Sequence, residues 1–156
     1  MVHIFCDGAS KNNPGPASIG AVAFLSKDSN FSANLRDYKE EKIESAFEIS
    51  QRIGEKTNNQ AEYLAVIAAL EAIQSKFQSE STIKFYLDSK LVVEQLNGNW
   101  KVKNENMKNL FLRCQQLLVY LNSKFNIKFI HVKREKNTIA DHLANQAFIQ
   151  PMKAAN

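Results

Sequence analysis

Four acidic residues stand where predicted elements begin or end, and two of them follow apolar runs. Asp7 follows the run Val2–Cys6, and Asp88 follows the run Ile83–Leu87. Both runs are typical of short buried strands. In an open α/β sheet, ligands bind at the carboxyl ends of the strands, so two carboxylates there are well placed for chemistry.

The other two acids, Glu62 and Asp141, open predicted helices. Four carboxylates that converged would repel one another strongly, and a multivalent cation is what stabilises such a cluster. Mg²⁺ is the natural candidate because it is a hard ion that prefers oxygen ligands. These acid positions therefore predict a magnesium centre, provided that the fold brings them together.

Each acid also has an ordinary structural explanation. Glu62 lies three residues after Asn59, as in a capping box, and Asp141 lies in a first helical turn, where the helix dipole favours negative charge. Asp7 and Asp88 each precede a small residue, which is a common turn composition. Periodicity alone does not decide between caps and metal ligands.

Apolar periodicity predicts the elements that must position the acids. Strands are expected at Val2–Cys6, Ser18–Leu25, Ala46–Ile53, Ile83–Leu87 and Ile127–Val132. Helices are expected from Asn59 to Ile73, at Leu91–Leu96, at Met107–Leu121, and from Asn137 or Thr138 to about Pro151. Three strands followed by alternating helices and strands indicate an α/β fold, a mixed sheet with helices on both faces.

The length of 156 residues predicts one domain over residues 1–150, followed by a C-terminal tail at 151–156. Residues 26–45 form a polar insertion between the second and third strands, far longer than a hairpin loop. Phe31, Leu35 and Tyr38 permit a short helical turn there. We expect a surface loop, with additional substrate contact as the alternative.

The net charge of +4 is unevenly distributed. Residues 1–83 carry a net −3 and residues 84–136 a net +7, with Trp100 among the lysines. Bases interleaved with an aromatic suit a phosphate backbone, although a solvated helix face has the same composition. The longest apolar run has eight residues, and the two cysteines form no paired motif. We therefore expect a monomeric cytoplasmic protein without a membrane partner.

The residues around the four acids form an ordered series of motifs that resembles type 1 ribonuclease H. The matching segments are Asp7-Gly8-Ala9-Ser10, Asn13-Pro14-Gly15-Pro16, Gly20, Thr57 to Tyr63, Leu87-Asp88-Ser89, Asn137, Ala140-Asp141 and Leu143-Ala144-Asn145. The resemblance implies a ribonuclease H-like α/β fold, a five-stranded mixed sheet whose first three strands are antiparallel, flanked by helices. It also implies an endonuclease that hydrolyses the RNA strand of RNA/DNA hybrids and leaves 5′-phosphate products.

The resemblance implies two Mg²⁺ ions per active site, with Mn²⁺ as an acceptable substitute. Asp7 would bridge both ions, Asp141 would hold the ion that activates the attacking water, and Glu62 and Asp88 would hold the ion on the leaving-group side. Two metals about 4 Å apart can stabilise the attacking and departing oxygens of an in-line displacement.

The resemblance also assigns residues that contact the substrate. Ser10, Asn13, Asn58 and Asn59 would read the 2′-hydroxyl that distinguishes RNA from DNA. The DNA strand would be contacted by Thr57 and Trp100, although Trp100 taken alone is more typical of a core aromatic. Asn58 and Asn59 also suit helix caps. The remaining expected phosphate contacts are Lys90, Lys101, Lys103 and Arg134.

The loop 133–137 departs from the pattern of many bacterial members, because it contains neither glycine nor histidine. It resembles a subgroup with a shortened loop in which an arginine, here Arg134, takes the neighbouring place. Arginine can hold a phosphate but cannot act as a general base near neutral pH. We expect His131 and His142 to be ordinary strand and helix-surface residues.

Two other functions remain open at this point. One is a module that binds hybrids without cleaving them, although such a cleft has no reason to keep four mutually repelling acids. The other is a DNA nuclease or junction resolvase on the same fold, which fold-level likeness alone does not exclude.

Overall fold

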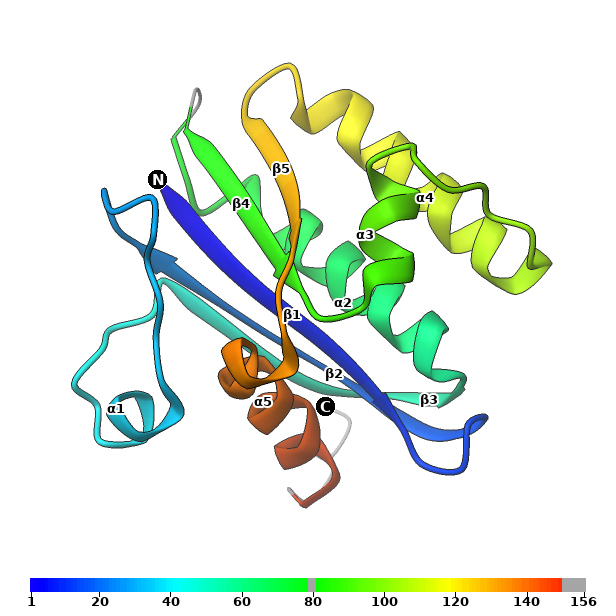
Figure 1. Cartoon of the computed structure of the whole chain (residues 1–156), viewed down its shortest axis with the longest axis horizontal. Coiled ribbons are helices and arrows are strands. Elements are labelled where there is room, and N and C mark those ends of the chain that lie inside the picture. The colour runs from blue at the N-terminus through cyan, green and yellow to red at the C-terminus, as the bar shows by residue number, and fades with distance from the viewer. Residues whose placement is uncertain (79–80, 150–156) are drawn as a thin grey trace.

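The computed structural model describes residues 1–78 and 81–149, so the predicted tail at 151–156 lies outside the described residues. The elements, in chain order, are β1 (Val2–Ser10), β2 (Gly15–Leu25), α1 (Leu35–Lys39), β3 (Phe47–Lys56), α2 (Asn58–Ile73), β4 (Thr82–Leu87), α3 (Lys90–Leu96), α4 (Glu105–Leu121), β5 (Asn126–His131), the 3₁₀ turn η1 (Arg134–Lys136) and α5 (Thr138–Ile149) (Figure 1). In these described ranges, no helix combines the length and apolar character needed to cross a bilayer.

The five strands form one sheet in the order β3-β2-β1-β4-β5. β1 pairs antiparallel with β2, and β2 pairs antiparallel with β3. β4 lies parallel to β1, and β5 lies parallel to β4. This arrangement confirms the predicted five-stranded mixed sheet in which the first three strands are antiparallel.

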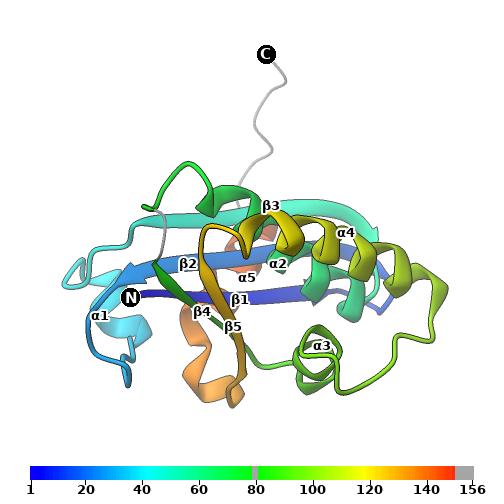
Figure 2. The same ribbon diagram turned by 90° about the horizontal axis from the view of Figure 1, so that it is seen from above.

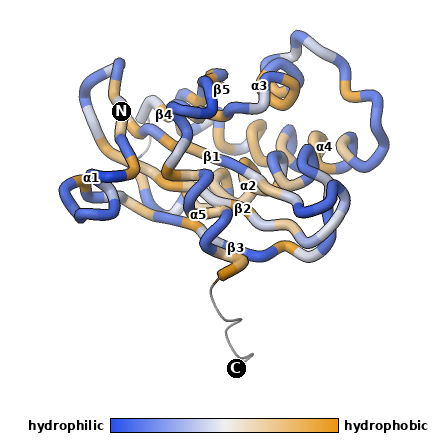
Figure 3. The backbone as a smooth tube through the Cα atoms, turned by 60° about the horizontal axis from the view of Figure 1, so that its bottom comes forward, coloured by the Kyte–Doolittle hydropathy of each residue, from blue (hydrophilic) through white to orange (hydrophobic). Residues whose placement is uncertain are grey.

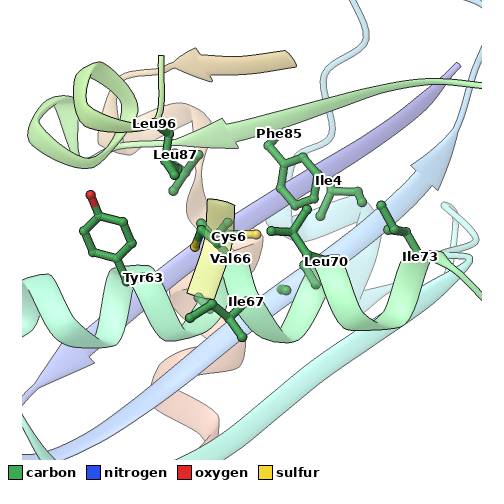
Figure 4. Packing of buried hydrophobic residues seen from close by; sticks show 14 of the residues in the cluster. Ile4, Cys6, Tyr63, Val66, Ile67, Leu70, Ile73, Phe85, Leu87 and Leu96 are labelled. Atoms are coloured by element: carbon green, nitrogen blue, oxygen red, sulfur yellow. The ribbon is translucent and has the colours of Figure 1, made fainter. Parts of the chain in front are cut away.

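Helices cover both faces of the sheet because its strands alternate apolar side chains between the two faces. Ile4 and Cys6 of β1 pack with α2, and α4 lies outside that helix. Figure 4 shows this cluster, in which α2 residues such as Leu70 face the strands. Phe5 points to the opposite face, where it packs in a second cluster with Leu143 of α5. α2 is buried at most positions, as its nearly uniform apolar composition predicts.

Residues 26–45 contain the predicted helical turn, as α1, and form a surface segment in which no residue is buried, although several apolar side chains pack against the second core cluster. Phe31, Leu35 and Tyr38 pack against that cluster on the α5 face. Figures 1 and 2 place α1 at the same end of the molecule as the N-terminus, opposite the end that carries α3 and α4. α1 itself is strongly hydrophilic, whereas the region where α2 meets the sheet is largely apolar (Figure 3).

Candidate active site

Asp7 and Asp88 come together because their strands are parallel and in register. The last paired residues of β1 and β4 are Cys6 and Leu87, so each aspartate is the next residue along its strand. Side chains alternate between faces, and both aspartates therefore project on the α5 side of the sheet. β1 does not end at Asp7, as the sequence analysis expected, because its pairing with β2 continues to Ser10.

Gly8 allows the first turn of α2 to approach β1 closely enough to deliver Glu62. A Cβ atom at Gly8 would overlap the carbonyl carbon of Ala61 and lie 2.5 Å from its oxygen. With only a hydrogen there, the Gly8 N–H donates to Glu62 Oε1 at 3.0 Å. The carboxylate of the helix is thus fixed directly beside Asp7, whose Oδ1 accepts a bond from the same N–H at 3.0 Å.

Gly20 performs the corresponding task for α5 on the other side. It lies opposite Asp7 in the β1–β2 pairing, and a Cβ atom there would overlap the Ala140 carbonyl oxygen and lie 2.5 Å from the Ala144 nitrogen. Ser50 Oγ donates to the Leu143 carbonyl at 2.6 Å and secures the helix to β3. This close seating brings Asp141, in the first turn of α5, within interaction range of Asp7.

Three of the four predicted ligands form a compact acidic group. Asp7, Glu62 and Asp88 each offer one carboxylate oxygen, and these oxygens lie within 4.8 Å of one another. Asp141 lies outside this group and interacts with Asp7. The structure therefore places the four acids at one site, in which Asp7 interacts with each of the other three.

Burial and neighbouring negative charge disfavour ionisation of the Asp7 and Glu62 carboxyls. Asp7 and Glu62 are each 6% exposed. Burial, together with the charges of Asp88 and Asp141, raises the pKa of Asp7 from 3.8 to about 7. Burial and the neighbouring Asp7 carboxyl raise the pKa of Glu62 well above its usual value.

The donor set fits a hard divalent cation. Its ligand atoms are all carboxylate oxygens, the type that Mg²⁺ and related ions prefer. Glu62 Oε2 is buried and, within the described residues, has no hydrogen-bond partner. An unpartnered buried carboxylate oxygen is costly, and a bound cation removes that cost.

Asn137 is a functional residue that the sequence analysis placed in the motif but gave no role. Its buried Nδ2 donates to the Cys6 carbonyl at 2.9 Å and to Asp88 Oδ2 at 3.3 Å. Its own carbonyl accepts from the Asp141 N–H at 3.1 Å. One residue therefore joins β1, the carboxylate after β4 and the first turn of α5. A polar residue between a strand and a helix, just before an acid, was the available signal.

The β1–β2 turn is tied to the start of α2 through three predicted substrate residues. The Ser10 N–H donates to Asn58 Oδ1, and the Asn58 N–H donates to Asn13 Oδ1, both at 2.9 Å. No hydrogen bond among the described residues uses the amide NH₂ groups of Asn13 and Asn58. Those donors are left for a ligand, whereas no contact of the Asn59 side chain contributes to this network.

The helix cap of α2 is Thr57, so the expected caps Asn58 and Asn59 are wrong. Thr57 Oγ1 accepts from the Gln60 N–H at 3.1 Å, and Gln60 Oε1 accepts from the Thr57 N–H at 2.9 Å. This reciprocal pair is a capping box one turn before Glu62, which replaces the alternative that Glu62 itself completes one. Glu62 is consequently free of a capping role.

Trp100 lies on the surface rather than in the core, because it is 45% exposed. Lys90 Nζ lies 5.9 Å from the centre of its ring, within cation–π range. Lys101 and Lys103 are exposed on the same connection between α3 and α4. These four residues, the basic connection, form a charged aromatic surface separate from the acids.

A buried polar relay connects the helix of Glu62 to this basic connection. Tyr63 is fully buried, and its hydroxyl donates to Gln95 Oε1 of α3 at 2.5 Å. Gln95 Nε2 in turn donates to the Lys101 carbonyl at 3.4 Å. Figure 4 shows the Tyr63 hydroxyl directed away from the apolar cluster. The relay fixes the backbone of the basic connection relative to α2.

The loop between β5 and α5 is short and contains the turn η1. Arg134 is exposed there, as a residue that contacts substrate phosphate must be. His131 Nε2 lies 3.2 Å from the Asp88 carbonyl oxygen, which is the local pairing expected for a strand residue. His142 is partly buried on α5 next to Asp141.

Comparisons with known proteins agree with this geometry. The RNase H family model matches residues 1–149. The RNase H1 structure from Halobacterium salinarum has 36% sequence identity and a TM-score of 0.77, covering 95% of this chain and 97% of that one. LC11-RNase H1, solved in complex with an RNA/DNA hybrid, has 34% identity and a TM-score of 0.76, with coverages of 94% and 96%.

The bifunctional protein Rv2228c of Mycobacterium tuberculosis is 40% identical over 147 residues. That alignment covers 94% of this chain but 35% of the relative, so the chain spans about a third of the mycobacterial protein. A five-stranded mixed sheet with a cluster of carboxylates at its centre is typical of metal-dependent nucleases of the α/β class. The chain belongs to the RNase H family.

Proposed function

We propose that this protein is an endonuclease that hydrolyses the RNA strand of RNA/DNA hybrids with two bound Mg²⁺ ions. The observation that carries the proposal is the convergence of Asp7, Glu62 and Asp88 within 4.8 Å, with Asp141 adjoining Asp7. Support also comes from the similar LC11-RNase H1, which was solved with a hybrid bound.

In this proposal Asp7 would help to hold both ions, because it interacts with each of the other three acids. Glu62 and Asp88 would complete the ligands of one ion, and Asp141 those of the other. When bound, the divalent ions would supply an activated water and stabilisation of the charge that develops on the leaving oxygen. The protein itself contributes no nucleophile, so the residues act by holding charge and geometry.

Selection of the RNA strand depends on the β1–β2 turn and on the start of α2, which hydrogen bonds hold together. The amide NH₂ groups of Asn13 in the turn and Asn58 in α2 have no partner among the described residues, so they can donate to a 2′-hydroxyl. The basic connection takes the DNA strand, with Trp100 against the sugar-phosphate path and its lysines on phosphates. Binding through such contacts weakens steeply as salt rises.

The test is one cleavage assay in Mg²⁺ with four labelled substrates: an RNA/DNA hybrid, duplex RNA, duplex DNA, and a DNA duplex containing a single ribonucleotide. We expect cutting of the RNA strand of the hybrid with 5′-phosphate ends, and no cutting of duplex DNA. Binding of the hybrid without products in either Mg²⁺ or Mn²⁺ would show a non-cleaving module instead. Equal cutting of duplex DNA would show a DNA nuclease or resolvase.

A further inference from the structure

A cavity of about 400 Å³ lies on the α5 face of the sheet, and none of the four acids lines it. Its floor consists of apolar side chains from three neighbouring strands and the segment after β5, namely Phe5, Tyr86, Ile130 and Val132. Lys84 and Lys136 stand at its rim, and residues 29–32 of the insertion form one wall. We call this the lysine-rimmed cavity. Its volume falls in the range of ~300–1,000 Å³ that is typical of small-molecule sites.

The wall from the insertion is held in place by aromatic contacts. The ring of Phe31 lies 5.0 Å from that of His3 and 5.3 Å from that of Phe24, measured between centroids. Lys84 Nζ donates to the Ser29 carbonyl at 3.5 Å. The floor is equally fixed, because the rings of Phe5 and Tyr86 stack at 4.6 Å. The cavity is therefore a built feature of the second core cluster.

Its charge is positive and uncompensated. Lys84 of β4 lies directly opposite Lys128 of β5 in the parallel register, an arrangement of like charges that costs stability. Within the described residues, neither lysine nor Lys136 forms a salt bridge. No acidic residue lines the cavity. The nearest acid in the wall sequence, Asp28, accepts a hydrogen bond from the Asn30 N–H at 2.9 Å.

An apolar floor with two lysines at its rim fits a ligand with a flat apolar body and an anionic group. We propose that the lysine-rimmed cavity binds a nucleotide, with its phosphate between Lys84 and Lys136 and its base against the apolar floor that includes Phe5 and Tyr86. The choice of a nucleotide among such anions rests on the proposed function. The nucleotide is either a free 5′-mononucleotide or the terminal nucleotide of a bound RNA strand.

The cavity is also connected to the acidic group through η1. Lys136 ends η1 and immediately precedes Asn137, which contacts Asp88. A nucleotide bound at Lys136 would therefore lie next to Asn137, the residue that contacts Asp88 and the Asp141 N–H. Binding of product in the cavity could in this way affect the acidic group.

The first experiment titrates 5′-AMP and 5′-UMP into the metal-free protein in the presence of a chelator, followed by amide NMR. We expect saturable shifts at Phe31 and Ile130, with inorganic phosphate and adenosine alone each binding more weakly than AMP. The double variant Lys84→Gln/Lys136→Gln should bind AMP at least tenfold more weakly. Lys42→Gln is the matched control, because this insertion lysine pairs with Glu40 at 2.9 Å and lies outside the cavity.

No shifts at Phe31 and Ile130 with 10 mM nucleotide, or shifts confined to residues around Asp7, would overturn the proposal. So would equal binding by the double variant, with folding of each single variant checked by circular dichroism. Because these titrations involve no cleavage, their failure leaves the proposed nuclease function untouched. A comparison of blunt hybrids with hybrids that carry a single-stranded RNA extension then shows which nucleotide the cavity binds. If the double variant binds only the extended hybrid more weakly, the ligand is the terminal nucleotide of the RNA strand. If it binds both hybrids as wild type does, the ligand is the free nucleotide.

Discussion

The acidic group and the basic connection of Lys90, Trp100, Lys101 and Lys103 are positioned in opposite ways. Glu62 and Asp141 are positioned by the close approach of α2 and α5 to the sheet at Gly8 and Gly20, and Asp88 is held by the Asn137 side chain. The basic connection is exposed and is fixed at one backbone carbonyl by the Tyr63–Gln95 relay. Phosphoryl chemistry requires fixed geometry, whereas contact with a nucleic-acid backbone tolerates adjustment. The closest packing in this comparison therefore lies at the acids, where the chemistry requires fixed positions.

If the positions of the acids depend on the close approach of α5 to β2, a side chain placed at Gly20 should cause the largest loss of stability. Gly20→Ala places a methyl group against α5, and we expect the free energy of unfolding to fall by ~3 kcal/mol or more, measured by urea denaturation. Gly54→Ala is the control, because no atom lies within 4 Å of its Cβ position and its φ of +81° costs about 1 kcal/mol. Equal losses in the two variants would contradict the role given to Gly20.

Removal of the Asn137 side chain, which holds Asp88, should have a smaller effect on the acidic group. Asn137→Ala leaves the Cys6 carbonyl without its donor and releases Asp88, so we expect kcat to fall ~10–100-fold and more Mg²⁺ to be required. Asn97→Ala, which removes an exposed bond to the Phe129 carbonyl, should leave kcat within about twofold. A normal kcat for Asn137→Ala would show that Asp88 needs no such support.

The repulsion among the acids predicts a pH dependence of stability in the metal-free protein. Because the folded state raises the pKa of Asp7 from 3.8 to about 7, this group favours folding at low pH and loses that contribution as the pH rises through 7. At pH 8, Asp7→Asn should therefore be more stable than wild type by about 4 kcal/mol, with the difference shrinking as the pH falls from 7 toward 4. Thermal unfolding with a chelator measures this. A less stable Asp7→Asn at pH 8 would contradict the account.

The smallest effect is expected where the basic connection is tied to α2. Tyr63→Phe removes the hydroxyl that holds Gln95, and we expect KM for the hybrid to rise ~3–10-fold while kcat stays within twofold, as for the loss of about 1 kcal/mol. Tyr120→Phe is the control, since among the described residues its hydroxyl accepts from Gln74 Nε2 and Lys124 Nζ, and both of these bonds are exposed. A fall in kcat without a change in KM would mean that the relay supports the acids instead.

Much of the fold follows from the sequence because it depends on local patterns. The apolar runs placed all five strands, and the periodicity from Asn59 placed the buried helix α2. The strand ends were wrong at Asp7 because pairing with β2 continues through small and polar residues that carry no apolar signal. The insertion lies at the surface as predicted, but the packing of Phe31 and Tyr38 against the second core cluster was not predicted, because it depends on contacts distant in the chain.

The identities of the four acids came from their motif context, but their convergence did not follow from periodicity. It depends on the equal register of Asp7 and Asp88 and on the absence of side chains at Gly8 and Gly20, which are tertiary facts. The cap assignment failed for a different reason, because Thr57 and Asn58 are both good caps and the choice is made by the hydrogen bonds of Asn58 to the β1–β2 turn.

The most direct measurement compares wild type with Asp7→Asn on an RNA/DNA hybrid labelled in the RNA strand, in Mg²⁺ under single-turnover conditions. Asp7 interacts with Asp141, Glu62 and Asp88, so one altered oxygen affects every proposed ligand position. The account predicts cleavage by wild type and a loss of at least about a thousandfold in Asp7→Asn, with hybrid binding retained. Undiminished cleavage by Asp7→Asn would contradict it.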